Sequence, residues 1–106
     1  VNAYTIQIDK ADRIAIMDEG SSSSVIDTYK APKGRSLGSP VSTTELQTLP
    51  YGISFAFATS GRSLWAGSFE SGNVEDYLYP AGGAAVQTIP GGGVSEGVAV
   101  TPPLAP

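Results

Sequence analysis

The chain has 106 residues, a net charge of −4, and neither Cys nor His. This length allows a single domain, the acidic balance gives no electrostatic footprint for nucleic acid or an anionic membrane, and the lack of Cys excludes a disulfide framework. Charged residues make up only 15%, beside 13 Gly and 8 Pro, a composition typical of many short strands joined by tight turns.

The first half of the chain alternates apolar and polar residues in three places, as half-buried strands do. This pattern predicts strands at 4–9, 13–17 and 25–29, with a turn at Lys10-Ala11-Asp12 between the first two. The segment 30–44 carries Gly and Pro near both ends, so we expect a long loop there. A fourth strand is then predicted at Leu46-Gln47-Thr48-Leu49.

The second half repeats this order of signals. Strands are predicted at 53–57, 63–66, 74–79 and 86–89. The pentapeptide Leu46-Gln47-Thr48-Leu49-Pro50 returns as Val86-Gln87-Thr88-Ile89-Pro90. No segment has the apolar periodicity of a helix, because Gly or Pro interrupts every window of helix length.

Four strands in a period of about 40–50 residues are typical of a propeller blade. We therefore predict one repeat region, with unit one at 3–50, unit two at 51–90, the first strand of a third unit at 96–102 and a Pro-rich tail at 102–106. The expected fold class is all-β, with two four-stranded antiparallel β-propeller-type blades plus one extra strand. A small β-sandwich is the alternative, since two packed sheets also bury both inner faces.

Several segments together resemble blades of the YVTN/NHL-type β-propellers. They are Ser60-Gly61-Arg62-Ser63-Leu64-Trp65-Ala66, Gly72-Asn73-Val74, Val86-Gln87-Thr88-Ile89-Pro90 and Gly97-Val98-Ala99-Val100-Thr101-Pro102. The resemblance covers residues 53–101 and is loose over residues 1–49. Some propellers of this kind are lactonases that hold a divalent metal in the central channel, so the resemblance implies a metal-dependent enzyme as one possible function.

The residue inventory restricts catalytic chemistry. Without His or Cys the chain has no Ser-His-Asp triad, no thiol nucleophile and no zinc site of the usual ligand type. Carboxylates could hold Ca²⁺, although the EF-hand spacing is missing, so no cofactor is expected. The weak candidate metal ligands are Asp9, Asp12, Asp18 and Glu19, and Asp27 and Asp76 are predicted to occupy the same slot in the third strand of each unit.

Two sets of residues are candidates for ligand binding. Trp65, Tyr77 and Tyr79 could stack on sugar rings, but packing of the sheets would use the same side chains. Lys30, Lys33 and Arg35 form either a partner-contact loop or a solvated insertion.

The sequence thus favours a structural or binding module of a larger extracytoplasmic or secreted bacterial protein over a lactonase-like enzyme. Expected partners are further blades, in the same chain or in a homo-oligomer, and an unknown protein or carbohydrate ligand, with no membrane span. A chain that begins at Val1 is expected to be a processed or excised piece. The predicted buried set is Ile6, Ile8, Ile14, Ile16, Val25, Phe55, Phe57, Leu64, Val74, Leu78, Val98 and Val100.

Overall fold

The computed structural model describes residues 3–32, 34–91 and 99–100. These residues form eight strands and no helix, so the all-β prediction is confirmed. The described part of the chain accordingly has no helix that could cross a membrane. The strands are β1 Ala3–Ile8, β2 Ile14–Asp18, β3 Ser24–Tyr29, β4 Ser42–Leu46, β5 Gly52–Phe57, β6 Ser63–Ser68, β7 Val74–Leu78 and β8 Gln87–Ile89.

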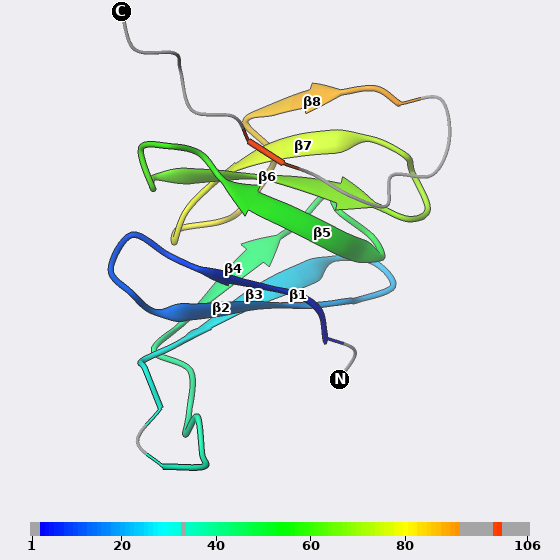
Figure 1. Ribbon diagram of the computed structural model, residues 1–106. Helices are drawn as coiled ribbons and strands as arrows, with labels where there is room; N and C mark the ends of the chain where they lie inside the picture. The colour runs from blue at the N-terminus through cyan, green and yellow to red at the C-terminus, as the bar shows by residue number, and fades with distance from the viewer. Residues whose placement is uncertain (1–2, 33, 92–98, 101–106) are drawn as a thin grey trace, which may run out of the picture.

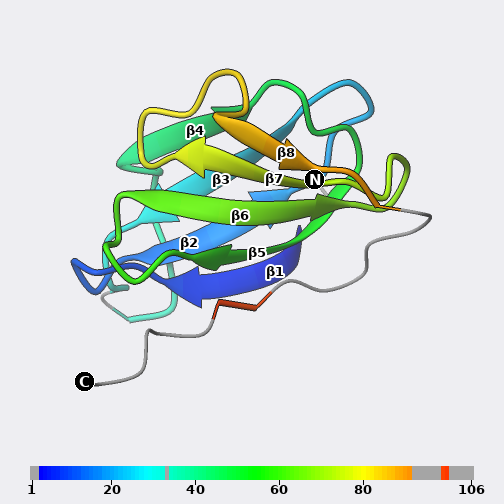
Figure 2. The same ribbon diagram turned by 90° about the horizontal axis from the view of Figure 1, so that it is seen from above.

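The strands make two four-stranded antiparallel sheets, each with its strands in chain order. Figures 1 and 2 show the two sheets stacked as layers, with β1 beside β5. Side chains of β1 bond to the backbone of β5: Thr5 Oγ1 donates to the carbonyl of Ile53, and Gln7 Nε2 donates to that of Phe55 at 3.2 Å. The predicted pair of four-stranded sheets is therefore present.

The hairpin turns of the two sheets are counterparts. Asp9 N donates to Arg13 O at 2.9 Å in the first turn, and Ala58 N donates to Ser63 O at 2.9 Å in the second. Asp12 has φ 61° and Gly61 has φ 73°, the left-handed conformation that such turns require. The two turns therefore share the left-handed fourth residue and its hydrogen bond to the first, although the second turn is one residue longer.

The fourth strand of the first sheet lies earlier than predicted. β4 ends at Leu46, and Leu49 N donates to Leu46 O at 3.1 Å in the turn that follows. Thr43 pairs with Asp27 as Thr88 pairs with Glu75. The counterpart of β8 is thus the start of β4, and the similar pentapeptide at 46–50 is displaced from it in space.

The strand pairing also shows which residues of β3 and β7 occupy equivalent positions. Asp27 lies opposite Ile16, and Glu75 lies opposite Ala66, so Asp27 corresponds to Glu75. The predicted equivalence of Asp27 and Asp76 is wrong by one residue. Most of the predicted strand at 96–102 lies outside the described residues, and no strand is assigned at 99–100.

One face of each sheet forms the core between the layers. Its fully buried apolar side chains are Ala15, Met17, Ile26, Leu46, Leu49, Phe55, Leu64, Ala66 and Tyr77, with Tyr79 nearly so. Phe57 packs against this cluster, and its ring lies 4.7 Å from that of Tyr79. Of the residues predicted to be buried, Phe55 and Leu64 are fully buried, and Phe57 is partly buried.

The predicted buried set is wrong for the first sheet and for β7. Ile6, Ile8 and Leu78 are exposed, and Ile14, Ile16, Val25, Val74 and Val100 are only partly buried, while Val98 lies outside the described residues. In these strands the predicted buried positions are displaced by one residue from the observed ones, and a displacement of one residue exchanges the two faces of a strand. In β2 and β3 both faces carry apolar side chains, so alternation alone does not indicate which face is buried.

Polar side chains in the core are bonded to partners across the two sheets. Thr28 Oγ1 lies 2.9 Å from Tyr79 Oη, and Thr44 Oγ1 donates to Pro80 O at 2.8 Å. In a second group, Thr48 Oγ1 and Tyr77 Oη donate to Glu75 Oε2 at 2.7 and 2.6 Å. Burial, together with the hydrogen bond of Tyr77 to Glu75, raises the pKa of Tyr77, which keeps the phenol protonated.

The first prediction concerns core packing. Leu64 is fully buried, whereas Leu37 lies in the loop between β3 and β4 and is 37% exposed. Leu64→Ala should lower the free energy of unfolding by about 2–5 kcal/mol, and Leu37→Ala by less than about 0.5 kcal/mol. Urea denaturation followed by Trp65 fluorescence measures both. Equal losses would contradict the register given for β6.

The second prediction concerns the contact of β4 with the loop after β7. Gly82 has φ 69°, and a Cβ there would lie 2.6 Å from Glu45 O and 2.8 Å from Glu45 N. The neighbouring Gly83 has φ 101° with open space around it. Gly83→Ala should cost about 1–2 kcal/mol of stability through backbone strain alone. Gly82→Ala should cost at least about 1 kcal/mol more, since backbone must also move, and thermal unfolding of both variants compares them.

Candidate functional site

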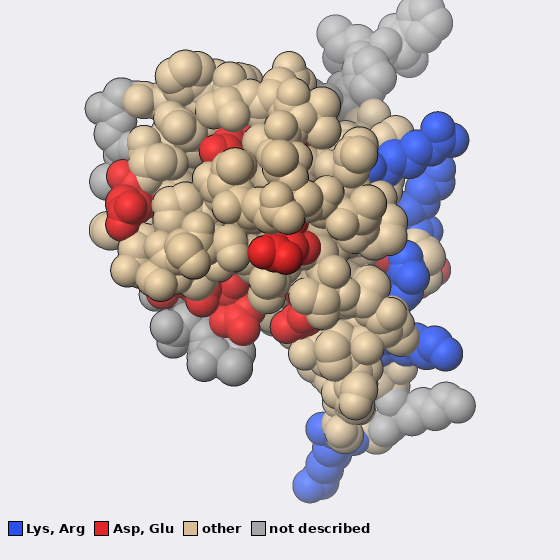
Figure 3. Space-filling view, turned by 180° about the vertical axis from the view of Figure 1, so that it is seen from behind, with Lys and Arg blue, Asp and Glu red and all other residues tan. Residues whose placement is uncertain are grey.

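The basic residues are gathered at one end of the strands. All six Lys and Arg lie in the β1–β2 turn, the β3–β4 loop and the β5–β6 turn, and five of them are described: Lys10, Arg13, Lys30, Arg35 and Arg62. Strand pairing puts the β1–β2 turn and the β3–β4 loop at the same end of the first sheet. The hydrogen bonds of Thr5, Gln7 and Lys10 to the backbone of Ile53, Phe55 and Ser60 place the β5–β6 turn at that end too. Figure 3 shows the Lys and Arg side chains along one side of the molecule and most acidic ones away from them. This end therefore has a positive field although the chain as a whole is acidic.

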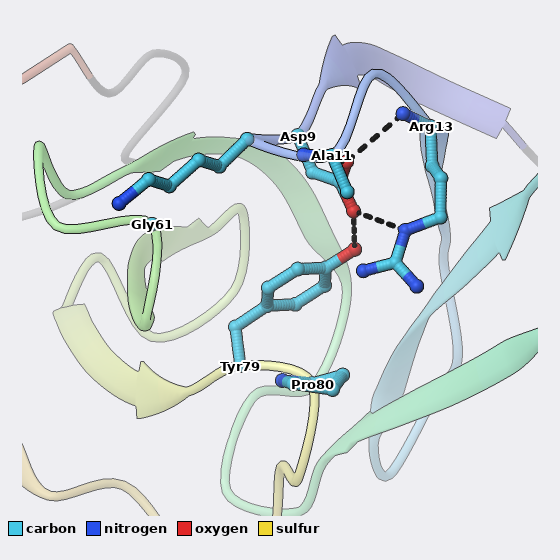
Figure 4. A pocket seen from close by; sticks show the side chains of 7 residues that line it. Asp9, Ala11, Arg13, Gly61, Tyr79 and Pro80 are labelled. Atoms are coloured by element: carbon cyan, nitrogen blue, oxygen red, sulfur yellow. Dashed lines mark hydrogen bonds and ion pairs between the residues drawn. The ribbon is translucent and has the colours of Figure 1, made fainter.

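A pocket of about 210 Å³ opens at this end between the two hairpin turns. The first turn and the segment that follows β7 supply most of its wall, and Figure 4 shows the side chains around it. The lining residues are Asp9, Lys10, Ala11, Arg13, Gly61, Tyr79 and Pro80. The pocket thus exists because the two sheets stack with their turns side by side.

Asp9 is the anchor of the pocket, because its carboxylate bonds to several of the residues that line it. Its Oδ1 accepts hydrogen bonds from the backbone N–H groups of Ala11 and Arg13, both at 2.9 Å. Its Oδ2 accepts from Arg13 Nε at 2.9 Å and from Tyr79 Oη at 2.8 Å. Both carboxylate oxygens are therefore occupied, so Asp9 orients its neighbours and is poorly placed to bind a ligand itself.

These bonds decide the ionisation of Asp9. Burial alone would raise the pKa of its carboxyl, but the hydrogen bonds from Arg13, Tyr79 and Ala11 favour the charged form and together hold the pKa below the ordinary value of 3.8. Burial raises the pKa of Tyr79, and the bond to Asp9 adds to that rise. The pair is a carboxylate and a neutral phenol at neutral pH.

Arg13 and Lys10 supply the positive charge of the pocket. The Arg13 side chain is about one-third exposed, and its ion pair with Asp9 uses Nε. Figure 4 shows its two terminal nitrogens extending beyond that contact toward the side of Tyr79 and Pro80. Within the described part of the chain, Lys10 Nζ donates to Ser60 O at 3.5 Å, which is a weak hydrogen bond. Both cations thus retain donors that can bind an anion.

The predicted aromatic patch is divided between different places. Trp65 is half-buried on the outer face of the second sheet, where it lies opposite Ala56 and Asp76. Tyr77 is fully buried in the core with Glu75. Of the three aromatic residues, Tyr79 lines the pocket, and the structure does not bring Trp65 or Tyr77 to it.

The predicted loop cations and acids are placed as follows. Lys30 and Arg35 are exposed at the basic end, outside the lining of the pocket, and Lys33 lies outside the described residues. Asp12 is exposed in the same turn as Asp9, whereas Asp18 and Glu19 lie at the opposite end of β2. Among the described residues no three His, Cys, Asp or Glu side chains are grouped to hold a metal ion.

Sequence reasoning missed Lys10, Arg13 and Pro80 as site residues. Asp9 and Arg13 are four residues apart across a turn, and an Asp at the start of a turn commonly bonds to the residues that follow it. This spacing could have indicated their ion pair. The contact of Asp9 with Tyr79 spans 70 residues and has no local signal. Comparison of the chain with protein-family models, curated proteins and solved structures finds no match.

The third prediction concerns acid stability. The folded-state pKa of Asp9 lies below its unfolded value, so its contribution to stability is present above about pH 4 and is lost as pH falls through the folded pKa. Asp9→Asn should destabilise the protein by about 1–3 kcal/mol at pH 7, because an amide places a donor against donors. Its stability should also fall less steeply than that of the unmodified protein between pH 5 and pH 2. Urea denaturation across this pH range measures both effects.

The control is Asp12→Asn, an exposed change in the same turn. Asn tolerates the left-handed conformation of this position as well as Asp does. Its pH profile should follow that of the unmodified protein. If Asp9→Asn also followed it, Asp9 would not be the anchor described.

Proposed function

We propose that the chain is a structural and ligand-binding module, formed by part of a β-propeller of a larger extracytoplasmic protein, and that its basic end binds a carboxylate-bearing sugar. One observation carries the binding proposal: the pocket has an apolar floor beside two cations, one of them oriented by buried Asp9. The proposal concerns binding and assigns no catalytic step to these residues.

The two cations suit a carboxylate. Arg binds carboxylates through parallel N–H donors, and Lys adds a mobile point charge. Asp9 occupies Arg13 Nε, which leaves the two terminal nitrogens of Arg13 for a ligand. Because Arg13 is already oriented, less side-chain entropy is lost when a ligand binds.

The remaining wall suits a small saccharide. Tyr79, Pro80, Ala11 and Gly61 present mostly carbon atoms to the pocket, and the C–H face of a pyranose packs against such surfaces. A volume of about 210 Å³ lies below the roughly 300–1,000 Å³ of sites for drug-sized ligands. A single acidic sugar unit, free or at the end of a chain, matches this size.

The propeller assignment rests on the repeated unit. Each sheet is a four-stranded antiparallel meander, and the two share their pairing register and, in their first turns, the hydrogen bond from the fourth residue to the first. Four-stranded sheets of this kind, repeated along a chain, are the building blocks of propellers. The low content of charged residues and the richness in Ser, Thr and Gly are the basis for proposing an extracytoplasmic location.

The fourth prediction tests the binding site. Lys10→Gln removes one cation and leaves the bonds of Asp9 intact. Glucuronate should bind the unmodified protein more tightly than glucose does, and Lys10→Gln should weaken glucuronate binding about 3–10-fold, a loss of roughly 1 kcal/mol for one partly exposed charge. NMR titration monitored at the amides of residues 9–13 and 58–62 measures the affinities.

Lys30→Gln is the matched control. It removes a cation from the same end but outside the pocket lining, so glucuronate affinity should change by less than about twofold. Equal losses in the two variants would show a diffuse effect of charge and contradict the pocket as the site. Equal affinities for glucuronate and glucose would contradict the role of the carboxylate.

A further inference from the structure

The two sheets pack head to tail, so different faces of the repeated unit meet. Ile6 lies opposite Ile16 in the first sheet as Phe55 lies opposite Ala66 in the second, which makes Ile6 the counterpart of Phe55. Side chains of paired residues share a face. Phe55 faces the first sheet and is fully buried, whereas Ile6 lies on the far side of the first sheet and is 62% exposed.

This relation holds across the whole sheet. The counterparts of Leu64, Ala66, Glu75 and Tyr77, which face the core, are found by the same pairing and all lie on the outer face of the first sheet. In that order they are Ile14, Ile16, Asp27 and Tyr29. The side-chain type is the same in each pair of counterparts: aliphatic residues correspond to aliphatic residues, a carboxylate to a carboxylate and Tyr to Tyr. The outer face of the first sheet is therefore built like the face that the second sheet uses for packing.

The outer face of the second sheet is the complementary surface. Val74 corresponds to Ile26, and Ile89 corresponds to Thr44, by their pairing with neighbouring strands. Ile26 and Thr44 are fully buried between the sheets, while Leu78 and Ile89 on the outer face are more than half exposed. Each outer face is thus the counterpart of a face that is already used in the existing interface.

We propose that the outer face of the first sheet docks on the outer face of the second sheet of another copy of this chain, which continues the packing seen within one chain. The existing interface shows that the two kinds of face fit each other. On the outside, the first sheet repeats the side-chain types of the packing face of the second sheet. The outer face of the second sheet repeats those of the first in part, with Val74 at the counterpart of Ile26 but Trp65 at that of Ala15. A contact between unlike faces is heterologous, so repetition closes into a ring when the rotation permits. Rings of four to eight four-stranded sheets would contain about two to four copies of the chain.

Sedimentation velocity on the full chain at about 10–200 µM tests this proposal. The mass that sedimentation gives for the unmodified protein should be two to four times that of the monomer. Ile6→Glu places a charge on the outer face of the first sheet, and Ile89→Lys places one on the outer face of the second, at the counterpart of buried Thr44. Each variant alone should be a monomer, because every head-to-tail contact needs both faces intact, with at least a tenfold loss of association affinity.

Mixing the two variants distinguishes head-to-tail contacts from symmetric ones. Ile89→Lys retains an intact outer face on its first sheet, and Ile6→Glu retains one on its second sheet, so an equimolar mixture should form a 1:1 heterodimer while each variant alone is a monomer. Leu37→Glu, an exposed change in the β3–β4 loop, is the control and should assemble like the unmodified protein. Ile8, which is 58% exposed beside Ile6, provides Ile8→Glu as a second variant if Ile6→Glu fails to fold.

Three results would overturn the proposal. The unmodified protein could be a monomer at 200 µM. Ile89→Lys could assemble as well as the unmodified protein, which would indicate contacts between two first sheets. The mixture could also remain monomeric, which would show that these two faces do not fit each other. None of these results bears on ligand binding in the pocket, which each monomer contains in full.

Discussion

Burial of one face of each sheet against the other is the constraint on which the structure depends. A four-stranded sheet alone leaves both faces in water, and only stacking removes Met17, Ile26, Phe55 and Leu64 from solvent together. Each such side chain contributes roughly 1.5–3 kcal/mol when buried. Since a domain of this size buries a modest share of its surface, this single layer of contacts supplies most of the hydrophobic stabilisation.

The stacking also creates the candidate binding pocket. It places the turn after β1 beside the turn after β5 and brings Tyr79 within hydrogen-bond distance of Asp9. Asp9 then orients Arg13 through Nε. The counterpart of Asp9 in the second turn is Ala58, which has no carboxylate. The first turn therefore differs from the second in its chemistry, although both have the hydrogen bond from the fourth residue to the first.

A heterologous interface has a consequence for the distribution of charge. Repetition by rotation keeps equivalent ends of the strands on the same side of an assembly. The cations of every copy would therefore lie on one side and most of the acids toward the other, as Figure 3 shows for one chain. An assembly would strengthen the positive field around each pocket, whereas the net charge of −4 per chain would keep the particle acidic as a whole.

Local signals were sufficient to predict much of the secondary structure. Alternation with period two gave seven of the eight strands to within one or two residues, and Gly, Pro and Asp marked the turns, because strand and turn preferences depend on neighbouring residues. The similar pentapeptides at 46–50 and 86–90 misplaced the fourth strand. Resemblance between short segments does not specify which residues pair across a sheet.

The amino-acid sequence by itself therefore determined the strands, their order and the repetition of a four-stranded unit. Tertiary structure decided which face of each strand is buried, since β2 presents Ile14 and Ile16 on one side and Ala15 and Met17 on the other, and both sides are apolar. Tertiary structure also decided the pocket, because Asp9 and Tyr79 lie 70 residues apart. The physical reason is that alternation records the pleat of one strand, whereas burial and the pocket depend on contact between two sheets.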